Sequence, residues 1–445
     1  MFRSKQSAWA VYLVLVVCLV PVVVPPGPAR TAIVDGLNLP ALGIFAVSML
    51  VTRQPLHVPF LIPVILISLG SVAATINAVN PAAAAVTLVQ DAYLYIWFVM
   101  LANIMQGRGD FRGLRLAWVC VANAVAIVGI IQVFAHGTAT PMDLLRPKGF
   151  RALGTFDQPD TLADYLVMSI FMVLSLNEEV GRAVRWSSIA IMCTGVVATK
   201  ANGGLGSLMV GLIAWTLVRG WTKQVPYQRL VAWALVAFGA GLATVWLIFG
   251  MRVGAGQLRE LQTNSIFGRV SHSTEGRVKI WDSLLRRYSN SPLGIGPGNS
   301  RWQIVTVEER ERPLASESGT DPFLSKEAHN DYLAYLIERG PLAVLGMLAL
   351  KFQVFVRITR WWRERAGSSR GRIRGGPLAA AVFGAWVASL INANTIETLH
   401  FRHVWLFLAM VCALGMMGED ASRTQPDRSS GDTPVSAGTR AVGVS

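Results

Sequence analysis

One histidine, His329, stands where the longest polar stretch of the chain, residues 251–330, meets an apolar segment. An imidazole, with an unperturbed pKa of about 6.5, can accept a proton from a hydroxyl group near neutral pH. A positioned base of this kind assists the attack of that hydroxyl group on an electrophile. The sequence therefore predicts a catalytic base at His329. The alternative is a histidine that caps a helix or lies at an interface.

Three basic residues beside apolar segments are the second feature. Arg277 opens a predicted helix in the polar stretch, Arg151 lies in the segment 148–154, and Lys200 follows an apolar run. A guanidinium group binds a phosphate through two parallel hydrogen bonds and keeps its charge, and it stabilises the charge that develops on a departing diphosphate. The sequence predicts that these three residues bind a diphosphate. The alternative for each is a cation in contact with solvent or lipid headgroups.

Carboxylates give weak support for a metal ion. Asp157 and Asp160 form the nearest pair, and Asp160 precedes an apolar run, so the simpler prediction is a helix N-cap. No clean Asp-x-Asp lies on the same side, and the sequence therefore predicts neither a metal nor a cofactor. Glu338 and Arg339 lie about 14–15 Å from His329 along a helix, too far to orient its ring, and are predicted to be structural.

The elements that must position these residues are membrane helices. The 445 residues are 53% hydrophobic and only 15% charged, which is typical of membrane proteins. A helix needs about 20 mostly apolar residues to cross a bilayer. The sequence predicts an all-α polytopic membrane protein with about twelve transmembrane helices, at residues 9–25, 37–51, 59–79, 85–104, 114–134, 161–176, 186–199, 205–218, 230–250, 331–356, 376–392 and 402–417.

The distribution of basic residues predicts the orientation. With a cytoplasmic N-terminus, the short inward loops hold 16 Lys and Arg residues and the short outward segments hold 6. Basic loops remain in the cytoplasm, and the seven arginines of residues 357–374 are the strongest anchor. Residues 1–417 are thus predicted to form one transmembrane catalytic domain, with 251–330 as a large periplasmic loop. Residues 418–445 are predicted to be a disordered cytoplasmic tail.

Within the loop, residues 276–288 predict a helix. Val278, Trp281, Leu285 and Tyr288 share one stripe and are the expected apolar face. This face is predicted to lie on the outer membrane surface or to pack on the rest of the loop.

Taken together, these segments resemble the O-antigen ligase and O-antigen polymerase family of bacterial membrane glycosyltransferases. The resemblance covers most of the chain. It rests on His329-Asn330-Asp331-Tyr332-Leu333 with Glu338-Arg339-Gly340, on Arg277-x-x-x-Trp281 before Gly294-Ile295-Gly296-Pro297-Gly298-Asn299, and on Arg151-x-x-Gly154-Thr155-Phe156 with Gln158-Pro159-Asp160.

The resemblance implies a GT-C-like helical fold in the bacterial inner membrane with the active site on the periplasmic face. It implies an undecaprenyl-diphosphate-linked glycan as donor and lipid A–core or a growing glycan as acceptor, without nucleic acid. The family histidine, matched by His329, is thought to activate the acceptor hydroxyl, and Arg277 matches an arginine thought to bind the donor diphosphate. Transfer is expected to be metal-independent and to invert the anomeric centre.

One segment departs from the family pattern. Members often carry Ser-Arg-Gly before the eighth span, where this chain has Asn202 with Lys200 nearby. A lysine supplies charge without the bidentate fork of arginine. The departure leaves open whether the protein is an O-antigen ligase or a polymerase of O-antigen or exopolysaccharide. A polysaccharide-related transporter and a structural subunit of an export complex are the non-enzyme alternatives.

The predicted orientation can be tested with reporter fusions. Fusions after Ser318 and after Arg370 should report opposite sides of the membrane, because the first follows the polar loop and the second lies among the anchoring arginines. Paired phosphatase and fluorescent-protein reporters make the measurement. Two fusions on the same side would contradict the orientation and remove His329 from the periplasm.

Overall fold

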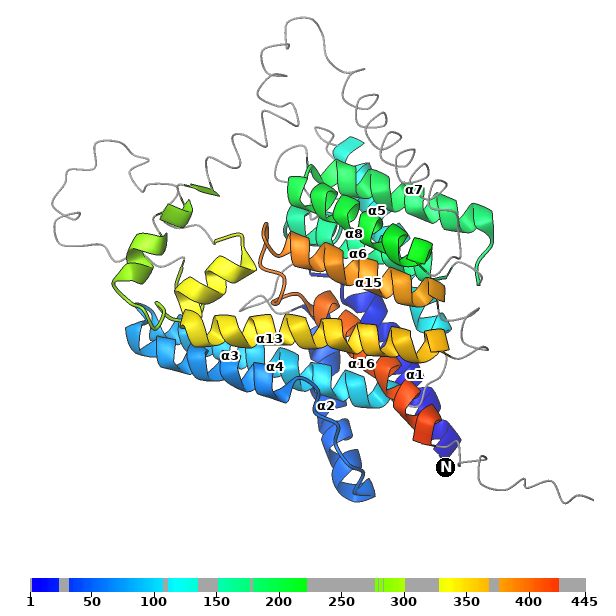
Figure 1. Ribbon diagram of the computed structural model, residues 1–445, viewed down its shortest axis with the longest axis horizontal. Helices are drawn as coiled ribbons and strands as arrows, with labels where there is room; N and C mark the ends of the chain where they lie inside the picture. The colour runs from blue at the N-terminus through cyan, green and yellow to red at the C-terminus, as the bar shows by residue number, and fades with distance from the viewer. Residues whose placement is uncertain are drawn as a thin grey trace, which may run out of the picture.

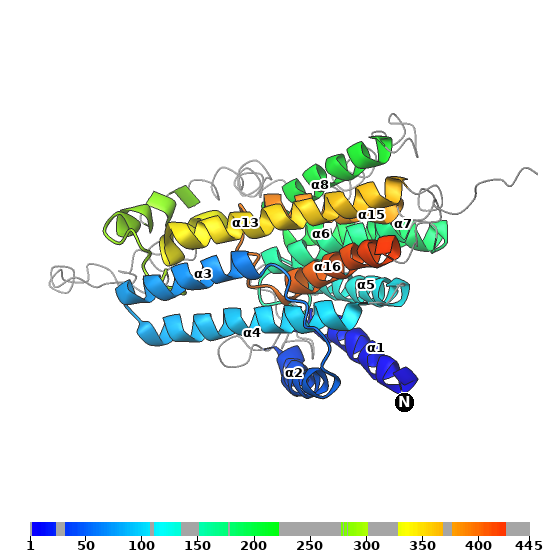
Figure 2. The ribbon, with the colours of Figure 1, turned by 60° about the horizontal axis from the view of Figure 1, so that its bottom comes forward.

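The chain folds into a bundle of α-helices. The computed structural model describes residues 2–23, 32–106, 111–134, 151–176, 179–221, 277–300 except 279 and 283, 328–367 and 376–423, and these residues contain no strand. The named helices are α1 Phe2–Leu19, α2 Ile33–Thr52, α3 Leu61–Ala74, η2 Thr75–Asn77, α4 Pro81–Met105, α5 Arg112–Phe134, α6 Pro159–Ser175, α7 Arg182–Thr199, α8 Asn202–Trp221, α13 Asp331–Gly367, α15 Gly376–Asn392 and α16 Arg402–Arg423 (Figures 1 and 2).

Most of the predicted spans coincide with helices. Every predicted span except 230–250, which lies outside the described residues, overlaps one of the named helices. Among the described residues, five helices are long and apolar enough to cross a membrane, namely α2, α4, α5, α8 and α13. The all-helical, polytopic membrane architecture is therefore confirmed, while the count of twelve and the GT-C-like type stay predictions.

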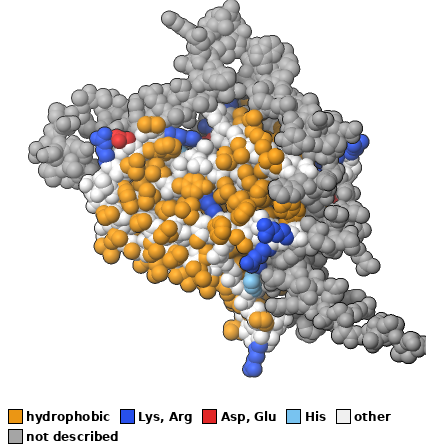
Figure 3. All heavy atoms as spheres, viewed as in Figure 1, with side chains coloured by type: hydrophobic (Ala, Val, Ile, Leu, Met, Phe, Trp, Pro, Cys, Tyr) orange, Lys and Arg blue, Asp and Glu red, His pale blue; other side chains and the backbone are white. Residues whose placement is uncertain are grey.

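The outer surface of the bundle is apolar. Large hydrophobic side chains of α3 and α13 point away from the protein, among them Ile62, Leu69, Val72, Leu345 and Phe352. Figure 3 shows this apolar surface on the face that carries these two helices. A continuous exposed apolar surface of this kind would drive aggregation in water. In a bilayer it is the surface that contacts lipid.

Helix α13 contains a sharp bend at Gly340. This residue has φ 74° and ψ 179°, a conformation that is essentially restricted to glycine, and Pro341 follows it. Gly340 packs closely against Leu293, in the turn that follows the helix over residues 277–289. A Cβ added at Gly340 would lie 2.5 Å from the carbonyl oxygen of Leu293. The bend therefore divides α13 into two helices, residues 331–339 and 341–367.

These two parts of α13 fold back on each other. The Nζ atom of Lys351 lies 3.5 Å from Oδ2 of Asp331, and a straight helix would place these residues about 30 Å apart. Residues 331–339 thus form a short helix beside the long part of α13 (Figure 1). The predicted span 331–356 therefore begins at Pro341, and the short helix does not belong to it.

The bundle end at which α6, α8 and α16 begin, called here the site end, is stepped. Helix α4 has 25 residues, about 37 Å, whereas α6 has 17 residues, about 25 Å. The hydroxyl of Tyr93, midway along α4, donates to Oδ1 of Asp35 near the start of α2 at 2.7 Å. The first turns of α4 therefore extend beyond the starts of the shorter helices. Figures 1 and 2 show α3, α4 and α13 extending past α6 and α15 at this end.

Helix α6 is the enclosed centre of the other helices. Every residue from Thr161 to Ser175 is buried, and α5, α7, α8 and α15 pack around it. Polar residues on such a helix must find partners within the protein, since neither water nor lipid headgroups reach them. The partner of a carboxylate on α6 therefore shows which other helix or turn α6 holds in place.

A helix over residues 277–289 of the polar stretch, called here the loop helix, packs in the step. Among its described residues, Ile280 and Leu284 are buried in one apolar cluster with Ala334 and Ile337 of the short helix, and Trp281 and Tyr288 are partly buried beside them. The prediction that Val278, Trp281, Leu285 and Tyr288 form the buried face is therefore wrong for two of the four residues. Val278 and Leu285 are 53% and 43% exposed. The helix packs on Ile295 and Ala328 of the polar stretch, as the second alternative predicted, and also on the short helix of α13.

We expect Gly340→Ala to destabilise the protein. A side chain in this backbone conformation costs about 1–3 kcal/mol and would also meet the Leu293 carbonyl. Thermal unfolding in detergent should show a lower Tm than wild type. Gly113→Ala is the matched control, because its added Cβ meets nothing within 4 Å. Equal Tm values for the two variants would mean that the bend does not require glycine.

Candidate active site

Arg151 is held at the site end by α6 and α7. Its Nε donates to the carbonyl oxygen of Thr199 at 2.8 Å, and its Nη2 donates to Oδ1 of Asp160 at 3.1 Å. The amide of Ala152 donates to the carbonyl oxygen of Ala198 at 2.9 Å. The segment before α6 is therefore docked on the last turn of α7. The side chain of Arg151 remains 37% exposed, so a ligand can reach it.

Asp160 is an ion-pair partner and not the predicted N-cap. The N-cap of α6 is Gln158, and Pro159 occupies the first helical position. Asp160 lies in the first turn, where its carboxylate also interacts favourably with the positive end of the helix dipole. Its pairing with Arg151 fixes that guanidinium group relative to α6.

Arg277 approaches the same place from the loop helix. Its Nη2 donates to the carbonyl oxygen of Thr395 at 3.2 Å. Burial lowers the pKa of Arg277, the carboxylate of Asp160 opposes this, and the positive charge of Arg151 adds to it. The two guanidinium groups are thus close enough to repel each other beside one carboxylate. This excess of positive charge in a partly desolvated position favours an anionic ligand.

Lys200 and Asn202 border this cluster. Lys200 caps α7 in a left-handed conformation with φ 54°, directly after the residue that accepts a hydrogen bond from Arg151. Asn202 is the first residue of α8. The backbone of Lys200, which was predicted to bind the diphosphate with the two arginines, therefore lies beside Arg151.

The turn that follows α15 reaches the cluster at Thr395. An added Cβ on Gly203, in the first turn of α8, would lie 2.0 Å from the hydroxyl oxygen of Thr395. Only a glycine permits this approach. Thr395 is therefore wedged between α8 on one side and the guanidinium group of Arg277 on the other.

His329 is attached to the loop helix through its neighbour. The Nε1 atom of Trp281, one helical turn beyond Arg277, donates to the carbonyl oxygen of Ala328 at 2.8 Å. His329 itself is half-buried and has φ 48°, an uncommon backbone conformation for a residue other than glycine. Such conformations persist where the surrounding contacts impose them, and they are frequent in active sites.

The capping alternative for His329 does not fit the structure. Asn330 caps the short helix, because its Oδ1 accepts from the amide of Leu333 at 3.0 Å. Asn330 also donates through Nδ2 to the carbonyl oxygen of Asn394 at 3.3 Å. The histidine side chain is thus not used to begin the helix that follows it.

The turn 393–398 joins the two halves of the site. The amide of Asp331 donates to the carbonyl oxygen of Ala393 at 2.8 Å, and the carboxylate of Asp331 accepts from the amide and the hydroxyl of Thr398 at 2.8 and 2.5 Å. Thr395 of the same turn contacts Arg277. The segment that bears the predicted base and the predicted anion-binding Arg277 therefore share one supporting turn, which sequence reasoning missed because the turn holds no histidine and no cation.

His400 is a second histidine at this end that the sequence analysis did not select. Its Nδ1 lies 3.7 Å from Oδ1 of Asp91, and its Nε2 lies 3.7 Å from Oε2 of Glu397. Burial lowers the pKa of His400, whereas the carboxylate of Asp91 opposes this.

Asp91 also pairs with the buried Arg339, which was predicted to be structural. Glu338 is likewise used in packing, since its carboxylate accepts from the amides of Gly298 and Ser300.

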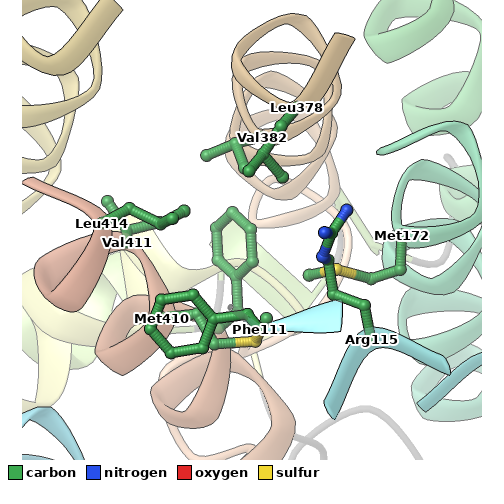
Figure 4. A pocket seen from close by; sticks show the side chains of 9 residues that line it. Phe111, Arg115, Met172, Leu378, Val382, Met410, Val411 and Leu414 are labelled. Carbon is green, nitrogen blue, oxygen red and sulfur yellow. The ribbon is translucent and has the colours of Figure 1, made fainter. Parts of the chain in front are cut away.

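The described residues show a small cavity far from this site. It lies between α5, α6, α15 and α16, near the start of α15 and the late turns of α16, and therefore at the opposite end of the bundle (Figure 4). Its volume is about 10 Å³, the room of a single water molecule. Its lining is apolar except for Arg115, which pairs with Glu179. The cavity is too small for a substrate.

Within the described part of the chain, no group of His, Cys, Asp and Glu side chains has the arrangement of a metal site. Asp160, the carboxylate nearest the guanidinium groups, is engaged by Arg151.

Comparison with known families supports the predicted resemblance. The family model of the O-antigen ligase matches residues 187–348. The match includes Lys200, Arg277 and His329, and it begins after Arg151. No curated protein matches the chain. The resemblance to the O-antigen ligase family is thus confirmed over this segment.

We expect Gly203→Ala to weaken anion binding. The added methyl group would displace Thr395, and with it the carbonyl oxygen that holds Arg277. We expect at least a several-fold loss of affinity for inorganic pyrophosphate, measured by titration calorimetry, because a displaced guanidinium group loses its charge-assisted hydrogen bonds to the anion. Gly206→Ala on the same helix is the control, since its Cβ meets nothing within 4 Å. Unchanged affinity in both variants would show that Thr395 does not govern the site.

Proposed function

We propose, on the premise that residues 187–348 match the O-antigen ligase family, that this protein is an inverting membrane glycosyltransferase. It transfers a glycan from undecaprenyl diphosphate to a hydroxyl group of an acceptor on the periplasmic face of the inner membrane. The acceptor is lipid A–core in the O-antigen ligase reaction. The observation that carries this proposal is the attachment of Arg277 and of the segment bearing His329 to the same turn, 393–398.

The arginines bind the donor diphosphate. Arg277 comes from the loop helix and Arg151 from the segment before α6, and both interact with the carboxylate of Asp160. Two guanidinium groups offer forked donors to the diphosphate oxygens and supply the charge that a divalent cation supplies in other transferases. Lys200 adds a third positive charge beside Arg151. The polyprenyl tail of the donor remains in the bilayer, against the apolar outer surface of the bundle.

His329 activates the acceptor. Its imidazole accepts the proton of the acceptor hydroxyl while the hydroxyl oxygen forms a bond to the anomeric carbon of the donor sugar. The bond between that carbon and the diphosphate oxygen breaks on the opposite face, and the electron pair leaves with the diphosphate. Attack from the opposite face inverts the anomeric centre. The diphosphate is a good leaving group, so the arginines suffice without a general acid.

The polymerase reaction is the second candidate. Asn202 stands where the family often has an arginine, with Lys200 nearby, and this departure fits a polymerase or exopolysaccharide relative. Both reactions use the same donor and a hydroxyl nucleophile. The lipid-linked species that accumulates in a deletion strain distinguishes them, because loss of a ligase leaves full-length glycan and loss of a polymerase leaves single repeat units.

We expect His329→Ala to reduce turnover about 10²–10⁴-fold, the usual contribution of a positioned base. Donor binding and thermal stability should stay close to wild type, since Asn330 caps the short helix and Trp281 bonds to the backbone at Ala328. Turnover and donor binding are measured in the same purified preparation. His400→Gln is the control for a second ionisable histidine at this end. Wild-type turnover in His329→Ala would end the assignment of the base.

We expect Arg277→Ala to weaken donor binding at least tenfold, because a charge-assisted contact to the diphosphate is lost. Arg277→Lys should recover only part of the loss, since lysine keeps the charge without the fork. Arg286→Ala provides a matched control on the same helix, as its side chain is 80% exposed and pairs only locally with Asp282. If all three variants bind undecaprenyl diphosphate like wild type, Arg277 is a surface charge.

A further inference from the structure

We propose that Asp164, Asn392 and His403 are positioning residues, which hold the turn at Thr395 and through it the guanidinium group of Arg277. This inference rests on the proposed function, in which Arg277 binds the donor diphosphate. None of the three residues is placed to touch the donor. They form a buried hydrogen-bonded chain that ends at the binding site.

The links are hydrogen bonds between side chains, except the last, in which a backbone carbonyl oxygen accepts from Arg277. His403 Nε2 lies 2.8 Å from Asp164 Oδ2, and Asn392 Nδ2 donates to Asp164 Oδ1 at 2.6 Å. The hydroxyl of Thr395 donates to Asn392 Oδ1 at 2.9 Å, and the carbonyl oxygen of Thr395 accepts from Arg277 at 3.2 Å. Residues of α16, α6, α15 and the loop helix are thus linked in one series.

The chemistry of the groups fixes the direction of each link. A carboxylate can only accept, so Asn392 must turn its amide nitrogen to Asp164 and its amide oxygen to Thr395. The hydroxyl of Thr395 lies 2.9 Å from that oxygen and also 2.9 Å from the backbone carbonyl oxygen of Asn392, so both of its acceptors belong to Asn392. The amide of Thr395 donates to the carbonyl oxygen of Asn392 at 2.7 Å, which fixes the turn at a second point. The carbonyl oxygen of Thr395 is left facing Arg277.

Stability alone does not explain this series of hydrogen bonds, because its polar residues are buried. Asp164 and His403 are each 1% exposed and Asn392 is 2% exposed. The rings of Phe156, Tyr165 and Phe401 surround the imidazole of His403. Burying such groups is costly, and apolar side chains of similar volume often stabilise as well or better. Their benefit is therefore a defined geometry, here that of the turn at Thr395.

Helix α6 relates the two arginines through this chain. Asp160 and Asp164 are four residues apart and share one face of α6. Asp160 holds Arg151 directly, whereas Asp164 holds Arg277 through Asn392 and Thr395. A single rigid and fully enclosed helix thus sets the spacing between two guanidinium groups that come from distant parts of the chain. A diphosphate requires such a fixed spacing.

The test is a double-mutant cycle between Asn392 and Arg277. Asn392→Leu breaks the chain between Asp164 and Thr395, and we expect it to weaken the binding of undecaprenyl diphosphate in detergent micelles about tenfold. In the Arg277→Ala background the same change should alter binding less than about twofold, since the group that it positions is absent. Thr395→Val, which removes only the hydroxyl link, should show the same dependence on Arg277.

Ser169→Ala is the matched control on α6, because it breaks the buried hydrogen bond from Trp118 without touching the chain. It should leave donor binding unchanged in both backgrounds. Equal losses for Asn392→Leu with and without Arg277 would overturn the inference and make the chain merely structural. If Arg277→Ala alone leaves binding unchanged, the proposed diphosphate contact has failed, and this inference fails with it.

Discussion

Charged groups at the site end of this bundle must be held next to hydrocarbon, and the pairing of those charges governs the rest of the structure. Lipid provides no hydrogen bonds, so every ionised group near it needs a partner from the protein. Asp35 pairs with Arg402, Asp91 with Arg339, and Asp331 with Lys351. The first two pairs join helices distant in the sequence, and the third joins the two parts of α13. The ion pairs thereby fix how the helices meet around the candidate site.

The two arginines of the candidate site do not each have a carboxylate partner of their own. Arg151 and Arg277 lie near a single carboxylate, and burial already disfavours the charged form of Arg277. An anion placed between them would relieve the repulsion and replace the lost hydration. The stepped shape of the bundle makes this possible, because the loop helix and the short helix of α13 occupy the step and bring Arg277 and the backbone of His329 to the ends of α7 and α8.

Sequence patterns predicted the helices and suggested Arg151, Arg277 and His329 as candidate site residues, because apolar runs and ionisable side chains are local signals. They did not predict which residues of the loop helix are buried, since Val278 and Ile280 are equally apolar and only tertiary contacts separate them. The bend in α13 had a signal in the dipeptide Gly340-Pro341, which marks a turn and was read as part of a span. Thr395 carried no signal at all, because its role rests on a backbone oxygen and on a chain of neighbours.

The central claim, that Arg151 and Arg277 together bind the donor diphosphate beside His329, is tested most directly by a structure of the protein in lipid nanodiscs with undecaprenyl diphosphate. The account predicts diphosphate density within hydrogen-bond distance of both guanidinium groups, bordered by the N-terminus of α8 and the turn 393–398. It also predicts that the acceptor side of the site opens toward His329. Diphosphate bound elsewhere, with Arg151 and Arg277 still paired only to Asp160 and Thr395, would contradict it.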